Sequence, residues 1–183
     1  MMANEDIMER KLSGETMFRG KLLDVEHWQV ELPDGRTALR EIVVHGAAVA
    51  VVPVDADGYV TLVRQYRPAV GRAMLEIPAG LLDSPDEPEL EAAQRELREE
   101  TGLIAANWVK LCDITPSPGY LTERIALFLA RDLSQGETEL DDDEFLRVEK
   151  LPLGELVGRV MRGELTDAKT LLGAVMAARV LGV

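Results

Sequence analysis

The stretch LEIPAGLLDSPDEPELEAAQRELREETGL, residues 75–103, predicts a helix with two distinct faces in its second half. Leu90, Ala93 and Leu97 recur at the i, i+3, i+7 spacing of a buried helical face. Gly102 suits the position just after the last helical residue, where a left-handed backbone ends many helices. We therefore expect a loop followed by an amphipathic helix that ends near Thr101.

A second face of this helix carries three carboxylates. Glu96, Glu99 and Glu100 are neighbours on a helix, and like charges at this spacing cost roughly 0.2–0.5 kcal/mol per pair. The negative C-terminal end of the helix dipole adds to that cost. Oxygen ligands held together against their own repulsion indicate a divalent-cation site, and Mg²⁺ suits carboxylates with several waters retained. Taken alone, the three glutamates fit a solvated charged face slightly better.

The order of residues from Glu87 onward settles that choice. Glu87, seven further residues and then RELREETGL resemble the signature of the Nudix hydrolase family, G-x5-E-x7-R-E-U-x-E-E-x-G-U, in which U is apolar. Every fixed position from Glu87 to Leu103 is met. Six residues instead of five separate Gly80 from Glu87, so the loop carries one extra residue.

Further stretches resemble the ADP-ribose pyrophosphatase branch of this family, which also includes hydrolases of other nucleoside diphosphate sugars. Pro118, in Ser117-Pro118-Gly119, matches the proline that marks this substrate in the family. The other matching stretches are QYRP at 65–68, EIPAG at 76–80, TDAKT at 166–170 and the strand-forming front extension.

The resemblance implies an α/β fold, a Nudix-type α/β/α sandwich with a mixed central sheet and an N-terminal β extension. Residues 1–44 would form the tail and the β extension, a dimerisation arm, and residues 45–183 the Nudix domain. Members of this branch are typically homodimers that exchange their front strands, so each active site borrows residues from the partner.

The resemblance also implies the metal ligands and their cofactor. Glu96 and Glu100 match the principal Mg²⁺ ligands, Glu99 shares a metal or bridges through water, and the backbone carbonyl of Ala79 is a further ligand. Arg95 matches the arginine that orients a glutamate of the motif. Mn²⁺ is the alternative metal.

Five residues are candidates for substrate contacts: Arg67, Arg40, Trp28, Pro118 and Glu123. Arg67 matches a residue that contacts the diphosphate, and Arg40 is a looser match in the front strands. For both arginines the alternative is an exposed charge at the end of a strand, and function is preferred only for Arg67. A strand tryptophan usually packs in a core, so stacking of Trp28 on a nucleobase is the second interpretation.

The general base should lie outside the metal-binding helix, because carboxylates occupied by metal are poor bases. Glu144 is the candidate, since it closes an acidic run before a predicted strand and adjoins Phe145, an apolar anchor. Glu123, in the loop that also contains Pro118, competes for the role. A solvated acidic loop without chemistry explains the run about equally well.

Apolar runs and turn residues predict the remaining elements. We expect a tail over 1–14, a hairpin of 16–32 and 36–44, and a second hairpin in which a buried strand, 47–54, pairs with 59–66. Further strands are expected at 75–78, 108–114, 125–130 and 145–148, and helices at 153–162 and 167–181, the latter capped by Thr166.

Composition limits the class of protein. The chain has 183 residues, 46% of them hydrophobic and 29% charged, which suits one ordered domain of moderate size. Its net charge of −13 disfavours nucleic acid and anionic membranes as partners. A single cysteine excludes an internal disulfide, and no apolar run reaches the roughly 18–20 residues of a membrane span. We expect a cytoplasmic protein.

The expected activity is Mg²⁺-dependent hydrolysis of the diphosphate bond of a small nucleotide sugar. For ADP-ribose the products would be AMP and ribose 5-phosphate. Hydrolysis of GDP-mannose or an oxidised nucleotide is the first alternative. A sensor that binds ADP-ribose without cleaving it is the second, and it is disfavoured because such sensors lose the glutamates that this chain retains.

Overall fold

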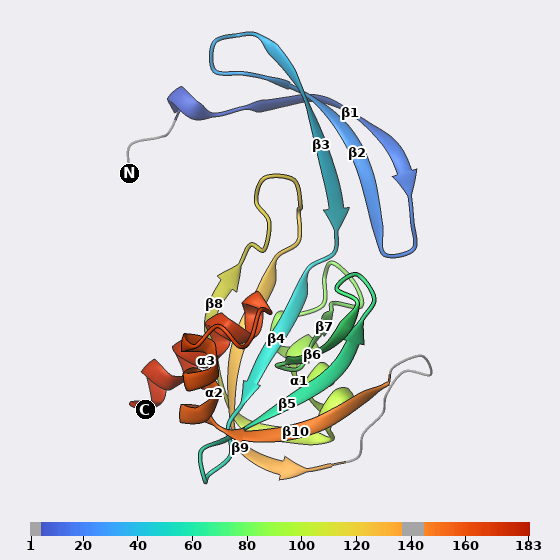
Figure 1. Cartoon of the computed structure of the whole chain (residues 1–183). Helices are drawn as coiled ribbons and strands as arrows, with labels where there is room; N and C mark the ends of the chain where they lie inside the picture. Colours follow the sequence, from blue (N-terminus) through green and yellow to red (C-terminus); the bar gives the residue numbers. More distant parts are fainter. Residues whose placement is uncertain (1–4, 137–144) are drawn as a thin grey trace. The chain divides into compact units, whose positions relative to one another are not determined.

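The computed structural model describes residues 5–136 and 145–183, which divide into two units (Figure 1). The first unit contains the residues up to Gly46 together with Thr115–Arg124. The second contains Ala47–Ile114 and Ile125–Val183, including all three α-helices of the described chain.

The N-terminal unit is a three-stranded antiparallel sheet in the order β1-β2-β3. Its strands are β1 (Arg10–Arg19), β2 (Leu23–Glu31) and β3 (Thr37–His45), after a short 3-10 helix, η1 (Glu5–Ile7). All ten residues of β1 are exposed. The expected tail is wrong from Arg10 onward, and the expected strand 16–32 is two strands, because the N–H of Gly20 closes a turn onto Leu23 O at 3.0 Å.

The second unit contains two sheets, and the larger one is mixed. In the order β7-β4-β9-β8, the β4–β9 pair is parallel and the other pairs are antiparallel. These strands are β4 (Ala48–Pro53), β7 (Ala79–Leu81), β8 (Leu103–Ile114) and β9 (Ile125–Gln135). The smaller sheet, in the order β10-β5-β6, consists of β5 (Tyr59–Arg67), β6 (Arg72–Glu76) and β10 (Leu146–Pro152).

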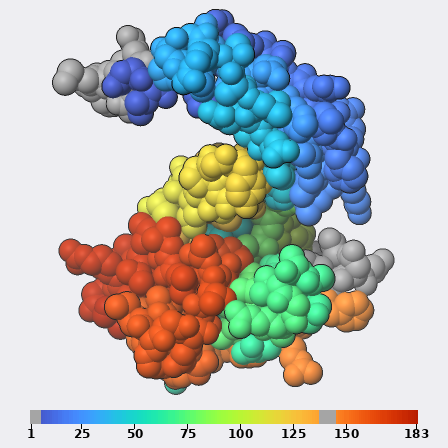
Figure 2. Space-filling model, turned by 45° about the horizontal axis from the view of Figure 1, so that its top comes forward, coloured from blue at the N-terminus to red at the C-terminus, as the bar shows by residue number. Residues whose placement is uncertain are grey.

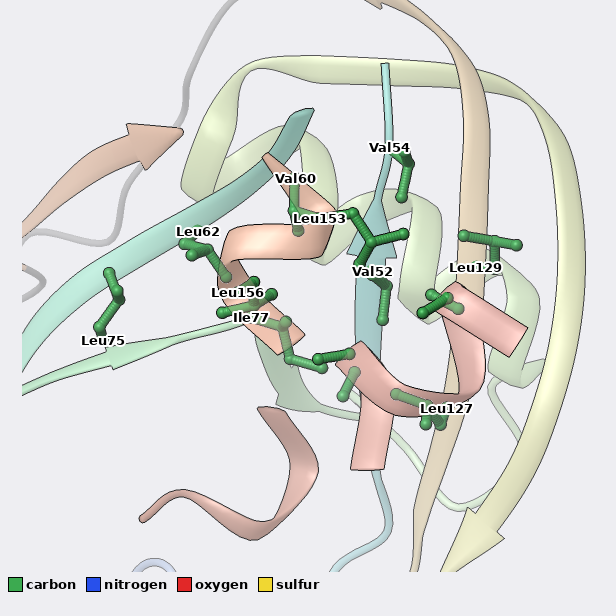
Figure 3. Packing of buried hydrophobic residues seen from close by; sticks show 14 of the residues in the cluster. Val52, Val54, Val60, Leu62, Leu75, Ile77, Leu127, Leu129, Leu153 and Leu156 are labelled. Carbon is green, nitrogen blue, oxygen red and sulfur yellow. The ribbon is translucent and has the colours of Figure 1, made fainter. Parts of the chain in front are cut away.

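Alternate residues of β4 face two different hydrophobic cores. Val49 and Val51 belong to a cluster with Ala93 and Leu97 of α1 (Glu89–Thr101). Ala48, Ala50 and Val52 belong to a cluster with α2 (Leu153–Met161) and α3 (Ala168–Leu181), part of which Figure 3 shows. Because successive strand residues point to opposite faces, helices cover both faces of the mixed sheet. The α/β/α sandwich is confirmed.

The turn between β5 and β6 lies next to the C-terminal helices, as Figure 2 shows with the turn in green and the helices in orange and red. Arg72 of β6 donates from Nη2 to the Oγ1 of Thr166, two residues before α3, at 2.8 Å. The start of α3 is thereby fixed close to the smaller sheet.

Three details of the expected elements are wrong. Strands β4 and β5 meet only at a bridge between Val54 and Val60 and then enter different sheets, so they form no extended hairpin. The N-cap of α3 is Asp167, whose carboxylate accepts the N–H of Thr170. On α1, Leu90 is 40% exposed, and Ala92, two residues later, is completely buried.

Within the described residues, every helix is too short or too polar to cross a membrane.

Candidate active site

Helix α1 buries Ala93 and Leu97 and carries its carboxylates on and beside that buried face. It ends at Gly102, whose backbone is left-handed with φ 71°, a conformation that costs glycine little. The N–H of Gly102 donates to Arg98 O at 2.7 Å. With Ala93 and Leu97 completely buried, Glu96 and Glu99 remain accessible at the edge of the helix.

Glu100 is the most deeply placed carboxylate of the helix and is 3% exposed. Its Oε2 accepts the backbone N–H of Ala79 at 3.1 Å. The strand β7, which begins at Ala79, is therefore bonded directly to the carboxylate face. This bond brings Glu100 and the backbone of Ala79 together, two of the expected metal ligands.

Glu96 occupies the space that a side chain at position 80 would fill. A Cβ built on Gly80 would overlap the carboxylate of Glu96. The backbone of Gly80 does not adopt positive φ, so space and not conformation requires the glycine. The extra loop residue before Glu87 leaves this approach intact.

Arg95 connects the loop to the helix. Its Nη1 donates to Glu96 at 2.7 Å and to Glu99 at 3.1 Å, while Nε and Nη2 donate to the two oxygens of Glu87, both at 3.2 Å. A further bond from Nη2 reaches the carbonyl of Leu81 at 2.9 Å. The arginine therefore contacts two of the three glutamates that are expected to bind metal.

The charges of this cluster stabilise one another. Burial disfavours the charged form of Arg95, but hydrogen bonds to Glu87 and Glu96 outweigh it and raise the pKa of the guanidinium. The hydrogen bond from Arg95 in turn lowers the pKa of Glu87. Both side chains are charged at neutral pH.

The donor set fits a hard divalent cation. Glu96, Glu99, Glu100 and the Ala79 carbonyl offer only oxygen atoms, which is the chemistry that Mg²⁺ prefers. The space left by Gly80 lets one carboxylate reach the backbone of β7. In the described chain, no three side chains of metal-binding type converge on one point. The carboxylates instead accept hydrogen bonds from Arg95 and Ala79.

Arg67, the expected diphosphate contact, is paired with a carboxylate that the sequence analysis did not single out. Its Nε and Nη2 donate to the two oxygens of Glu76, both at 3.0 Å, and this pairing raises the pKa of Arg67. Glu76 is 2% exposed. A glutamate between Leu75 and Ile77 in an apolar strand was a signal for a buried charge, which requires a partner.

Four of the expected substrate or catalytic residues belong to the N-terminal unit. Trp28 donates from its indole to Glu26, and the ammonium of Lys11 lies 3.7 Å from its ring centroid. Arg40 is paired with Glu9. Pro118 is exposed, and a carboxylate oxygen of Glu123 lies 3.8 Å from Nδ1 of His45.

Glu144, the expected general base, lies outside the described residues. Phe145, which was expected to anchor it, is 83% exposed and packs into no core. The assignment of Glu144 therefore stays a prediction that rests on the resemblance and on the acidic run.

The structure combines a mixed α/β sandwich with a set of glutamates on the helix beside its central sheet, and an arginine binds these glutamates. This combination is typical of the Nudix hydrolases. Residues 44–172 match the family described as NUDIX domain. The chain belongs to the Nudix family and is a Nudix hydrolase.

Characterised proteins extend this likeness over most of the chain. It is 40% identical to the ADP-ribose pyrophosphatase of Bacillus subtilis (strain 168), over 91% of this chain and 90% of that protein. It is 38% identical to the ADP-ribose pyrophosphatase of Mycobacterium tuberculosis, over 94% of this chain and 83% of the relative. The crystal structure of an ADP compounds hydrolase superposes with a TM-score of 0.84 at 27% identity, covering 95% of this chain and 94% of that one.

Proposed function

We propose that this protein hydrolyses the diphosphate bond of ADP-ribose, with Mg²⁺, to AMP and ribose 5-phosphate. The observation that carries the proposal is the carboxylate face of α1, where Glu96 fills the space at Gly80 and Glu100 bonds Ala79. The two ADP-ribose pyrophosphatases that match nearly the whole chain support the choice of substrate.

The chemistry requires that negative charge be neutralised, because the oxygens of a diphosphate repel an attacking hydroxide. Mg²⁺ held by Glu96, Glu99, Glu100 and the Ala79 carbonyl would supply that neutralisation and activate a water. The protein's own residues do the rest of the positioning. Arg95 holds Glu96 and Glu99 in place, and Arg67 offers N–H groups to the phosphate oxygens.

A base on another loop then removes the proton of the attacking water. We assign this role to Glu144, with Glu123 as the competing candidate. The water oxygen forms a bond to phosphorus while the bridging P–O bond breaks. One phosphate leaves with AMP and the other with ribose 5-phosphate.

The functional form that we propose is a homodimer in which the N-terminal strands are exchanged between subunits. The exposure of every residue of β1 supports it, because an open edge strand favours pairing with another chain. Trp28 and Arg40 would then act as substrate contacts.

A substrate panel with Mg²⁺ tests the proposal. We expect AMP from ADP-ribose and less product from GDP-mannose, with release measured by chromatography. Preferential release of GMP from GDP-mannose would mean that GDP-mannose, and not ADP-ribose, is the substrate. Release of orthophosphate from nucleoside triphosphates, without cleavage of any diphosphate sugar, would overturn the proposed function.

A further inference from the structure

The first turn of α3 is bonded to the segment that follows β6. The hydroxyl of Thr170, a completely buried residue, accepts the N–H of Ile77 at 2.9 Å and donates to Asp167. From the same turn, Lys169 donates to Oε2 of Glu76 and, at 3.0 Å, to Asp167. This turn therefore fixes both the side chain of Glu76 and the backbone of the next residue.

Glu76 in turn fixes Arg67. The two bonds between them, both 3.0 Å, use two of the five N–H groups of the guanidinium, which leaves three for another acceptor. The side chain of Glu76 is 3% exposed and that of Arg67 is 39% exposed. Glu76 thus holds the guanidinium on its buried side, and the exposed side is accessible to another acceptor.

The same segment continues to the metal-binding face. After Ile77, the carbonyl of Pro78 accepts the N–H of Val51 at 2.9 Å, and the N–H of Ala79 then donates to Glu100. Bonds from α3, β4 and α1 therefore hold consecutive residues of one short segment. Lys169, at the start of α3, and Arg67 thus bond the same carboxylate, that of Glu76.

We propose that Lys169 is a positioning residue that, through Glu76, orients the guanidinium of Arg67 to receive an anionic diphosphate. The inference rests on the proposed function for the role of Arg67. Lys169 itself is too deep to bind substrate, because its side chain is 12% exposed and its bonds go to Glu76 and Asp167. Removal of the Lys169 ammonium leaves Glu76 paired with Arg67, and the two side chains then gain freedom to rotate together.

Steady-state kinetics on ADP-ribose with Mg²⁺ test this role in the full-length protein. We expect Lys169→Met to raise KM about ten- to a hundredfold, the range for a displaced positioning group, with a smaller change in kcat. Lys169→Arg should restore most of the affinity. Lys150→Met is the matched control, because Lys150 pairs with Asp55 at 3.2 Å on the exposed surface. An unchanged KM in a folded Lys169→Met protein would overturn the proposal.

A double-mutant cycle separates positioning from an independent effect. If Lys169 acts through Arg67, the Arg67→Ala, Lys169→Met double variant should bind substrate within about twofold of Arg67→Ala alone. Losses that multiply would show that Lys169 acts by another route and would overturn the proposal. If Lys169→Met fails to fold, Lys169→Gln replaces it in the cycle, since glutamine also removes the ammonium charge but keeps a polar end with N–H donors.

The cycle also distinguishes this inference from the proposed function. A folded wild-type protein that leaves ADP-ribose intact refutes the function alone. The same cycle is then measured by calorimetry on the affinity for inorganic pyrophosphate with Mg²⁺. Non-additive losses there support the positioning role of Lys169, and additive losses refute it.

Discussion

The absence of a side chain at Gly80 leaves room for the carboxylate of Glu96. An alanine at position 80 would overlap the Glu96 carboxylate, which is the end of a flexible side chain and can move away. We expect Gly80→Ala to keep its fold but to raise the Mg²⁺ concentration for half-maximal activity about ten- to a hundredfold. Gly154→Ala is the control, since its Cβ would meet only Val183, at 3.9 Å. Equal Mg²⁺ requirements for the two variants would contradict this reading.

Glu100 is both buried and expected to bind metal, so its substitution separates the two roles. In Glu100→Gln the amide oxygen can still accept the N–H of Ala79, while the charge that a cation needs is lost. We expect the melting temperature without Mg²⁺ to stay unchanged or rise slightly, and Mg²⁺-supported activity to be lost. Glu91→Gln, on the exposed side of α1, should change neither. Unfolding of the metal-free Glu100→Gln protein would mean that the charge is structural.

The general base is tested by comparing two carboxylates. Losing a general base costs roughly 10²–10⁴ in rate, whereas losing a surface charge costs almost nothing. We expect Glu144→Gln to lower kcat by at least about a hundredfold, while Mg²⁺ and substrate still bind. Normal turnover by this variant, together with an inactive Glu123→Gln, would assign the role of base to Glu123.

The contact between β6 and α3 predicts how stability depends on pH. Burial raises the pKa of Glu76, but Arg67 and Lys169 outweigh it and lower the pKa overall. The ionised carboxylate therefore stabilises the fold above the ordinary glutamate pKa of about 4.3, and this contribution is lost as the pH falls through the lowered folded value.

We expect Glu76→Gln to reduce the free energy of unfolding by about 3 kcal/mol at pH 7, as for one partner lost from a buried ion pair. The difference from wild type should shrink below about pH 4.3. Urea unfolding from pH 7 to pH 3 measures it, with Glu91→Gln as the exposed control. A difference that stays constant over this range would exclude ionisation of Glu76 as the cause.

Local sequence patterns predicted helix α1 and strand β4 correctly. They did not predict that β4 and β5 enter different sheets, because that depends on pairing between strands distant in sequence. Periodicity and Gly102 fix the end of α1 within a few residues, and a continuous apolar run marks β4. The turn after β4 also forms, with Asp55 N–H bonded to Tyr59 O at 3.0 Å. Its strands diverge because β4 pairs in parallel with β9, from Ala48 opposite Ile125, and no local pattern encodes that partner.

The candidate site likewise contains residues that a local stretch of sequence suggested and residues that only the fold brings together. The expected ligands and Arg95 lie close together in the sequence, within residues 79–100, and the resemblance of this stretch to the Nudix signature implied their roles. Glu76 and Lys169 are 93 residues apart in sequence, and only the fold shows that they meet. The stretches that contain them were recognised as resemblances, while their shared function in holding Arg67 became visible only in the packing.

The N-terminal unit has an exposed apolar surface that its own sheet does not cover. The exposed side chains include Leu12, Met17 and Phe18 of β1, Leu22 in the following turn, and Leu39 of β3. β1 is also an edge strand of this three-stranded sheet, and exposed apolar side chains on an edge strand favour association. A second copy of the chain is the partner that we propose for this surface.

Sedimentation at micromolar concentration should therefore show twice the chain mass of 20.2 kDa. We expect Phe18→Asp to shift the protein toward the monomer, because Phe18 is 57% exposed and would carry a charge into an apolar interface. Thr16→Asp adds the same charge to an exposed polar position of β1 and should sediment as wild type. If the site is shared between subunits, the loss of dimer in Phe18→Asp must be matched by a loss of ADP-ribose hydrolysis that rises again at higher protein concentration. A fully active monomer would refute both the dimer and the shared site.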